Sequence, residues 1–175
     1  MKPYSFAISL LLCLQLHAQT AWDYRTAKQK LQLPHFTASI DSVIYNNEML
    51  KGKIVYINFW YAACSPCMAE LEPLNEIYHK LKNEKNFEFL SFCLDSPDVI
   101  NMLIDKYQIK YPVLYMPRDQ VKKMNITNGF PASIITDREG NIIYKRIGGS
   151  SLKKEAGRII KKEVYPQIKK SIADF

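Results

Sequence analysis

The segment Cys64-Ser65-Pro66-Cys67 places two thiols three positions apart, which is the spacing of a dithiol that can open and close as a disulfide. The segment follows the apolar run 54–60 and precedes a stretch with helical periodicity. The first sulfur should therefore lie at a helix start, where unpaired N–H groups and the positive dipole end favour a thiolate. Such a site lowers the pKa of a cysteine from near 8.5 to about 7 or below. We predict that Cys64 is the attacking nucleophile.

Cys67 should lie inside the first helical turn, within reach of the Cys64 sulfur once a mixed disulfide with another molecule has formed. Pro66 occupies an early helical position, where its missing N–H costs little and its ring stiffens the loop. An inert structural disulfide is the alternative. So short a loop removes little entropy from the unfolded chain, so redox chemistry is favoured.

Other chemistry for the cysteines finds few partners in the sequence. A zinc site needs a second close pair of ligands, whereas Cys93, His35 and His79 are far apart. Haem attachment needs a histidine directly after the second cysteine, and Met68 stands there. We therefore predict no metal and no other cofactor. Cys93 falls within a strand pattern, which favours a small buried hydrophobe over a resolving or regulatory thiol.

The elements that position this motif are predicted from periodicity and turn residues. In chain order they are a hairpin at 36–40 and 43–45, a strand at 54–60, a helix from 67, a strand at 87–94, a helix at 99–107, a strand at 113–116, a short helix at 119–124, a hairpin of 133–136 with 142–147, and a helix over 151–172. The near-continuous apolarity of 54–60 predicts a central strand covered on both faces. The crossovers predict parallel strands with helices on both faces, an α/β fold with a central mixed sheet.

The N-terminus has the order of a secretory signal: Lys2, an apolar run over 6–16, then small and polar residues. That run is far shorter than the roughly 20 residues of a membrane span, and we expect cleavage after Ala18 and no span in the mature chain. A lipid-modified Cys13 is discounted, because Leu12 stands where such signals have a small residue. Residues 19–34 form a lead-in segment without an assigned function, and 35–175 form one domain. The mature chain then works in an oxidising compartment.

The chain carries a formal net charge of +7, and its basic residues are densest over 153–170. Their spacing suits the solvent-facing side of a terminal helix. Nucleic-acid binding is not predicted, because no aromatic-interleaved basic motif accompanies them.

Three features resemble the thioredoxin fold over residues 35 to about 170: the run 59–67, the βαβαβ-then-ββα order, and Phe130-Pro131 ahead of a strand. Within that fold the chain is most similar to the exported TlpA/ResA group, which has an N-terminal hairpin and a Glu three residues past the second cysteine. Glu70 stands at that offset. The resemblance implies that Cys64 attacks, that Cys67 resolves, and that Pro131 is a cis-proline packed against the disulfide.

The resemblance also implies a substrate-binding surface around the motif. The backbone of Phe130 would pair with an extended substrate strand, beside Trp60, Ser65 and Pro66. Two positions differ from the thioredoxin pattern, with Ala63 in place of a Trp and Asn58 in place of an Asp, and Pro73 comes one residue later than the usual helix proline.

Glu70 is the candidate proton acceptor, because Asn58 is neutral and cannot supply a base. Its i, i+3 spacing from Cys67 places both on one side of the helix. If burial raises its pKa, it can exchange a proton with Cys67. Otherwise it faces solvent and complements the helix dipole.

The leading functional prediction is an exported, periplasmic thiol:disulfide oxidoreductase that reduces disulfides in exported client proteins. The proline in CSPC resembles that of reducing members of the fold. The resemblance implies a membrane thiol reductant of the DsbD type as the recharging partner and apocytochrome c as one client. One alternative is a non-catalytic peptide-binding module with a locked disulfide. Another is a thiol peroxidase. Peroxidases of this fold resemble a Thr-x-x-Cys pattern, however, and here Tyr61 occupies the Thr position before Cys64.

Overall fold

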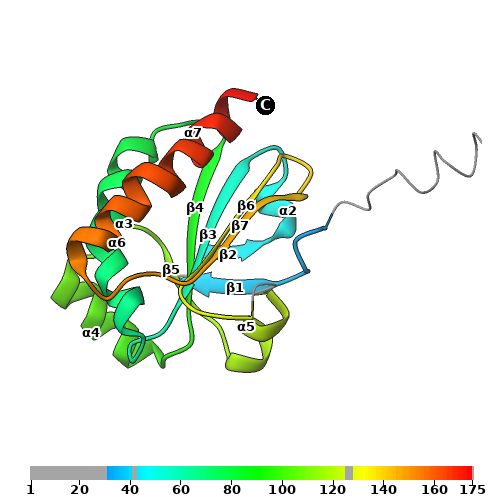
Figure 1. Ribbon diagram of the computed structural model, residues 1–175. Helices are drawn as coiled ribbons and strands as arrows, with labels where there is room; N and C mark the ends of the chain where they lie inside the picture. Colours follow the sequence, from blue (N-terminus) through cyan, green and yellow to red (C-terminus); the bar gives the residue numbers. More distant parts are fainter. Residues whose placement is uncertain (1–30, 41–42, 125–127, 175) are drawn as a thin grey trace, which may run out of the picture. The chain divides into compact units, whose positions relative to one another are not determined.

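The computed structural model describes residues 31–40, 43–124 and 128–174 of the 175. The predicted signal peptide and most of the lead-in segment lie outside the described residues. The elements follow one another as shown in Figure 1. They are β1 (Thr37–Ile40), β2 (Val43–Asn46), α2 (Asn47–Leu50), β3 (Ile54–Trp60), α3 (Ser65–Leu81), β4 (Phe87–Cys93), α4 (Pro97–Tyr107), β5 (Val113–Tyr115), α5 (Arg118–Met124), β6 (Ala132–Thr136), β7 (Ile142–Ile147), α6 (Lys153–Ile159), the π-helical turn η1 (Ile160–Val164) and α7 (Tyr165–Asp174).

A five-stranded mixed sheet in the order β5-β4-β3-β6-β7 forms the centre of the domain. β3 pairs in parallel with β4, and β4 in parallel with β5, whereas β6 and β7 add on antiparallel. All seven residues of β3 are buried, because the strand has neighbours on both edges and covering elements on both faces. The predicted central strand and the mixed α/β class are confirmed.

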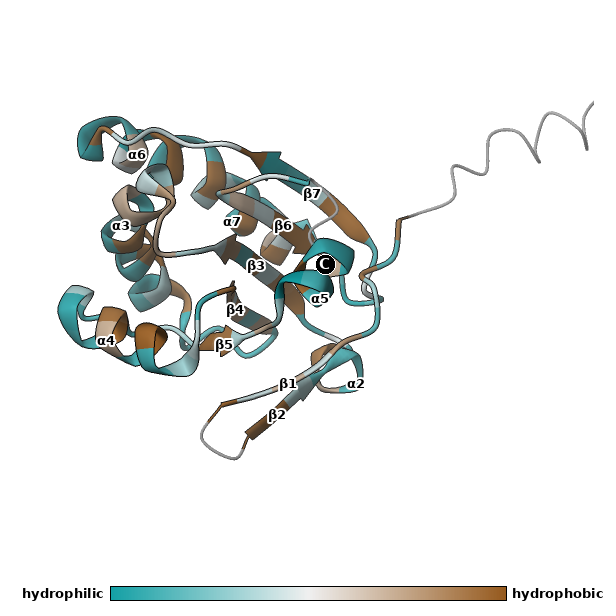
Figure 2. Ribbon diagram, turned by 90° about the horizontal axis from the view of Figure 1, so that it is seen from below, coloured by the Kyte–Doolittle hydropathy of each residue, from teal (hydrophilic) through white to brown (hydrophobic). Residues whose placement is uncertain are grey.

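The two crossover helices lie on the same face of the sheet, which differs from the expected distribution over both faces. Apolar residues of α3 and α4 share one core cluster with α7, and Figure 2 shows α3, α4 and α6 on one side of the sheet. Both crossovers step in the same direction, from β3 to β4 and from β4 to β5. Right-handed connections that step the same way place their helices on one face.

The N-terminal hairpin and α5 cover the opposite face. β1 and β2 pair antiparallel as predicted, and the Phe36 ring meets the Phe92 ring of β4 edge-on at 5.3 Å. Val121 and Met124 of α5 are buried in the same cluster. The short helix α2 was not predicted from the sequence. The Asn46 side chain starts it by accepting a hydrogen bond from the Met49 N–H at 3.0 Å.

Within the described residues, sheet-like pairing is already present at residue 31, four residues before the predicted start of the domain. The Leu33 N–H donates to the Gly140 carbonyl at 2.9 Å, and the Ile142 N–H donates to the Leu31 carbonyl at 2.7 Å. Gly140 has a φ of 81°, which favours glycine in the turn between β6 and β7. The predicted hairpin of these two strands is confirmed.

The predicted C-terminal helix is interrupted by a π-helical turn. In η1 the Tyr165 N–H donates to the Ile160 carbonyl, five residues back. Pro166 follows directly, and because it lacks an N–H it cannot continue the α-helical hydrogen-bond pattern at that point. The buried face of the helix nevertheless continues across the π-helical turn, because Ile160, Val164 and Ile168 are all buried and are spaced four residues apart.

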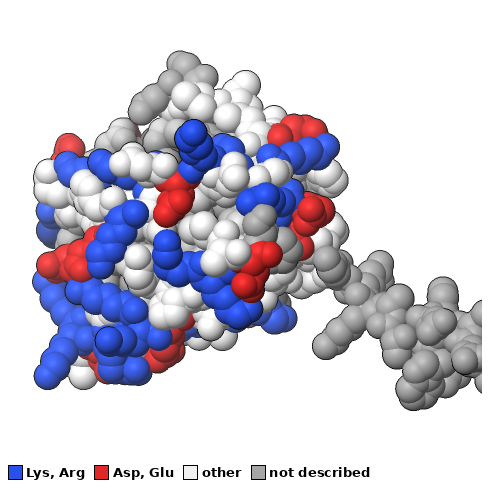
Figure 3. Space-filling view, turned by 90° about the horizontal axis from the view of Figure 1, so that it is seen from above, with Lys and Arg blue, Asp and Glu red and all other residues white. Residues whose placement is uncertain are grey.

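Charged side chains lie on the solvent-facing side of these helices, as predicted. Lys161 pairs with Glu76 of α3 at 2.7 Å, and Arg158 pairs with Glu155 at 2.8 Å. Figure 3 shows Lys and Arg over one face of the molecule, with Asp and Glu among them. In the part of the chain that the structure describes, no helix combines the length and apolarity needed to cross a bilayer.

Candidate active site

The CSPC segment joins the end of the central strand β3 to the start of helix α3. Cys64 is the N-cap residue of α3 and is disulfide-bonded to Cys67. The Cys67 N–H donates to the Cys64 sulfur at 3.2 Å, and the Met68 N–H donates to the Cys64 carbonyl at 3.1 Å. The first turn of α3 contains no acidic residue. The amide groups and dipole at this helix start therefore act on the Cys64 sulfur without an offsetting negative charge in that turn.

The two sulfur-bearing residues differ little in exposure in the disulfide state. Cys64 is 5% exposed and Cys67 is 1% exposed, so Cys64 is more covered than a helix start suggests. Ser65 between them is exposed and Pro66 is half-buried.

The loop before Cys64 is held to the end of β4 by Asp95. The Ala62 N–H donates to Asp95 Oδ2 at 2.6 Å, and the Cys93 thiol donates to the same oxygen at 3.4 Å. Burial raises the pKa of Cys93 to about 12, so this thiol stays protonated at neutral pH. The prediction that Cys93 is a small buried residue is confirmed.

The Phe130–Pro131 peptide bond is cis, as the resemblance implies. Ala132, the next residue, pairs with Phe59 near the end of β3, so the proline enters β6 at the sheet edge where the CSPC loop begins. The Phe130 ring meets the Tyr61 ring edge-on at 5.2 Å. Phe130 is half-buried and Pro131 is buried. These contacts bring Phe130 and Pro131 to the same end of the sheet as the two cysteines.

Glu70 lies inside the protein and does not face solvent. Its side chain is 1% exposed, and its Oε1 accepts a hydrogen bond from Arg146 Nη1 of β7 at 3.3 Å. Burial raises the pKa of Glu70 to about 7, and the Arg146 guanidinium opposes part of that rise. The other oxygen, Oε2, is buried and has no hydrogen-bond partner. Of the two interpretations made from the sequence, burial is the one the structure supports.

Gly149 covers this carboxylate without a side chain of its own. A Cβ at position 149 would come within 2.8 Å of Glu70 Oε1 and within 2.8 Å of Pro131 Cγ. The preceding residue, Gly148, donates its N–H to the Pro131 carbonyl at 2.8 Å. The segment after β7 therefore lies directly against both the carboxylate and the cis-proline.

Two other predicted positions have structural partners. Trp60 is fully buried, and its indole N–H donates to Ser91 at 2.7 Å, so the structure does not place it on a surface that a client can reach. Asn58 is also buried, and its amide donates to the Ala132 carbonyl at 3.3 Å.

Sequence reasoning missed Arg146, Gly149 and Asp95. Arg146 lies on the inward side of β7, where alternate residues are less exposed. A charged residue at an inward position of an alternating strand could have indicated a buried partner of opposite charge. Asp95 lies two residues after the end of β4, which is parallel to β3, and the carboxyl ends of parallel strands meet at one edge. Gly149 left no signal in the sequence.

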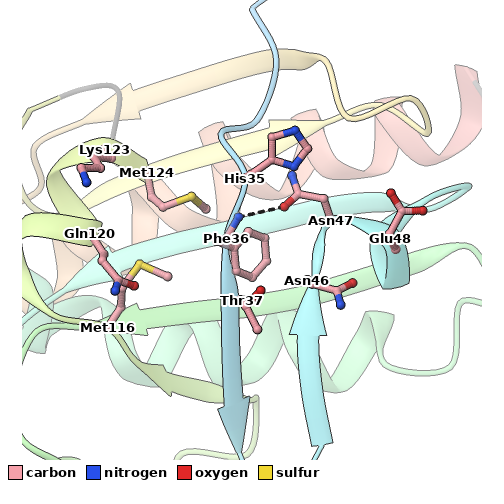
Figure 4. A pocket seen from close by; sticks show the side chains of 10 residues that line it. All are labelled: His35, Phe36, Thr37, Asn46, Asn47, Glu48, Met116, Gln120, Lys123 and Met124. Atoms are coloured by element: carbon pink, nitrogen blue, oxygen red, sulfur yellow. Dashed lines mark hydrogen bonds between the residues drawn. The ribbon is translucent and has the colours of Figure 1, made fainter.

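A surface pocket of about 570 Å³ lies away from the cysteines. It opens between the hairpin and α5 and is lined in part by Phe36, Asn47 and Met116, as Figure 4 shows. The Phe36 N–H donates to the Asn47 side chain at 2.9 Å in its wall. No residue of the CSPC segment lines it.

Comparison with known proteins agrees with this geometry. The family model for the AhpC/TSA family matches residues 30–145. The thiol-disulfide oxidoreductase ResA of Bacillus thuringiensis subsp. konkukian (strain 97-27) is 28% identical over 142 residues, which cover 78% of this chain and 82% of the relative. ResA of Bacillus anthracis is 31% identical over 125 residues, covering 66% of this chain and 70% of the relative.

Among solved structures, a Chlorobium tepidum protein assigned as the thiol:disulfide interchange protein DsbE superposes with a TM-score of 0.68 at 21% identity, over 82% of this chain and 96% of that one. This likeness supports the thioredoxin-like fold. The matched family model and the ResA relatives show that the chain belongs to the AhpC/TSA family and is, within it, a ResA-like thiol-disulfide oxidoreductase.

Proposed function

We propose that this enzyme reduces disulfides in exported client proteins through the Cys64–Cys67 pair. The observation that carries the proposal is the pair itself, with Cys64 at the start of α3 and Cys67 in its first turn, beside a buried carboxylate on the same helix. A locked structural disulfide would not require a buried acid nearby with one oxygen lacking a hydrogen-bond partner, because such a group lowers stability.

The proposed reaction consists of two thiol–disulfide exchange steps. The Cys64 thiolate attacks a client disulfide, which forms a Cys64–client bond and releases one client thiolate. Glu70 then takes the proton of Cys67, and the Cys67 thiolate attacks the Cys64 sulfur. This closes the Cys64–Cys67 disulfide and releases the second client thiolate. Two electrons pass from the protein dithiol to the client, and the client thiolates take up two protons.

In this proposal the client surface consists of Ser65, Pro66 and Phe130, and the buried cis-Pro131 sets the course of the Phe130 backbone. The backbone of Phe130 lies next to a strand start, where an extended peptide can pair with its N–H and carbonyl. Tyr61 borders the same surface through its ring contact with Phe130.

Reduction of insulin disulfides tests the activity. The reduced protein, freed of small thiols, should release insulin thiols, and Cys64→Ser should abolish the release. Cys93→Ser is the matched control, because the buried Cys93 takes no part in the proposed exchange and a serine hydroxyl can still donate to Asp95, so the rate should stay unchanged. Binding of an extended peptide without any reduction would instead favour the peptide-binding module.

Export, the clients and the recharging partner form the second part of the proposal. Residues 1–18 act as the signal peptide, a membrane thiol reductant of the DsbD type restores the dithiol, and apocytochrome c is one client. Mass measurement of the protein purified from a bacterial envelope should give an N-terminus at Gln19. Cys67→Ser should trap mixed disulfides, because the resolving thiol is gone, and peptide mapping identifies the trapped proteins. An uncleaved chain confined to the cytoplasm contradicts this part.

A further inference from the structure

The Glu70 carboxylate is held by only one of its two oxygens. Oε1 accepts from Arg146 Nη1 at 3.3 Å, whereas Oε2 is buried without a hydrogen-bond partner. A buried polar atom without a partner is costly, so its persistence in a core calls for an explanation. The unpaired oxygen belongs to a residue one helical turn after Cys67, on the same side of α3.

Arg146 comes from a distant part of the chain, 76 positions after Glu70. The Arg146 side chain is 15% exposed, so it spans from the surface to the buried acid. In the sheet, Arg146 of β7 pairs with Ser133 of β6, which is two residues after Pro131. Gly149 lies against the same carboxylate, because a side chain at position 149 would collide with Glu70 Oε1.

We propose that Arg146 is a positioning residue for the thiol chemistry: it holds Glu70 by Oε1 and leaves Oε2 as the atom that takes the proton of Cys67. This rests on the proposed function, in which Cys67 must lose a proton to resolve the mixed disulfide. The guanidinium does not transfer the proton. It keeps the carboxylate in place and offsets part of the effect of burial on its protonation.

The other groups facing Glu70 do not replace Arg146. Tyr56 of β3, Tyr144 of β7 and Tyr111 before β5 are electrostatically coupled to it. Burial raises the pKa of each of these tyrosines, so they stay neutral over the working range of pH. Cys67 lies one turn earlier on the same helix. Arg146 is the cation that opposes the raised pKa of Glu70.

A direct titration of Glu70 tests this without any activity measurement. Carboxyl carbon NMR of the oxidised protein follows Glu70, and the signal missing in Glu70→Gln assigns it. Arg146→Met should move the Glu70 titration midpoint upward by about one pH unit, the low end of the effect of a nearby opposite charge. Lys145→Met is the matched control, because it removes a neighbouring cation from the exposed side of β7 and should leave the midpoint in place.

A midpoint that moves no more in Arg146→Met than in Lys145→Met would overturn the proposal. If Arg146→Met does not fold, Arg146→Lys decides instead. It keeps a cation but loses the planar donor, so a smaller upward shift is expected and an unchanged midpoint contradicts the proposal.

Reductase rates across pH separate this proposal from the proposed function. The acid limb of the rate profile should move to higher pH in Arg146→Met, so that the rate is low near neutral pH and recovers when the pH is raised. In the Glu70→Gln background, Arg146→Met should cause no further shift, because the two residues act as one unit. A pH-independent loss in both backgrounds would overturn the proposal, since it would show a merely structural role. A wild-type protein that reduces nothing would refute the proposed function and leave the titration result standing.

Discussion

Asp95 Oδ2 accepts a hydrogen bond from the Ala62 N–H at 2.6 Å, which ties the loop two residues before Cys64 to the end of β4. The same oxygen accepts from the Cys93 thiol at 3.4 Å. Because strands β3 and β4 run in parallel, the loop after β3, which leads to Cys64, and the loop after β4, which contains Asp95, lie side by side. Asp95 therefore holds the loop that leads to the CSPC segment from a position just after the neighbouring strand.

Replacing Asp95 with Ala should lower the free energy of unfolding by about 1–3 kcal/mol, because the Ala62 N–H and the Cys93 thiol lose their acceptor. Urea unfolding of the oxidised protein measures this. Asp95→Asn should restore part of the loss, since its carbonyl oxygen can still accept. Asp105→Ala, at an exposed position on α4, is the control. Equal losses in Asp95→Ala and Asp105→Ala would show that the bond to Ala62 contributes nothing.

Cys64 alone should be alkylated rapidly in the reduced protein near neutral pH. Its sulfur lies at the start of α3, where the helix amides and dipole favour the thiolate, whereas Cys67 lies inside the first turn and burial raises the pKa of Cys93 to about 12. Mass mapping after brief iodoacetamide treatment identifies the labelled residue. Dominant labelling of Cys67 or Cys93 would assign the nucleophile to another position.

Glu70→Gln should slow reductase turnover by roughly ten- to a hundredfold, the low end of the loss expected for a general base. The wild-type rate should rise with pH through the Glu70 pKa of about 7, and the variant should lack that rise. Insulin reduction measured from about pH 5 to pH 9 gives both profiles. Glu72→Gln, exposed on the same helix, should behave as wild type. Superimposable profiles for the wild type and Glu70→Gln would exclude Glu70 from the proton transfer.

Burial of Glu70 also has a signature in stability. Its pKa is raised from 4.5 to about 7, so the folded protein binds more protons than the unfolded chain between those values. Stability should therefore fall as pH rises from about 4.5 to about 7, by roughly 3 kcal/mol at the limit. Denaturant unfolding of the oxidised protein should show this decline for the wild type and its absence in Glu70→Gln. A decline of the same size in both proteins contradicts the raised pKa.

Gly149→Ala should lower both stability and turnover, because the added Cβ would come within 2.8 Å of Glu70 Oε1 and Pro131 Cγ. Overpacking of this kind costs about 1–3 kcal/mol. The φ of Gly149 lies outside the left-handed region, so the effect is steric and not backbone strain. Gly157→Ala on α6 is the matched control, since its Cβ would meet no atom within 4 Å and should be neutral or stabilising. Urea unfolding and insulin reduction compare the two, and a Gly149→Ala protein indistinguishable from Gly157→Ala would show that the space is not used.

Local signals in the sequence were sufficient for most of the fold and for the redox pair. The apolar run 54–60 predicted a buried central strand, and the change to helical spacing after Cys67 placed the CSPC segment at a strand–helix junction. Both features depend on neighbouring residues, whose periodicity is set by the backbone geometry of strands and helices. Glu70 could likewise be placed relative to Cys67, because both lie on one helix.

The tertiary structure decided what surrounds those residues. Whether Glu70 was buried or exposed could not be read from its own helix, since the answer depends on Arg146 and Gly149, which arrive with β7 from the end of the chain. Trp60 shows where the resemblance was wrong: the apolar run 54–60 predicted its burial, whereas the resemblance placed it beside a client surface, and the structure has it buried with its indole N–H bonded to Ser91. Sequence periodicity determines which side of an element is apolar, whereas contacts between distant segments are set by the packing of the whole sheet and its covering helices.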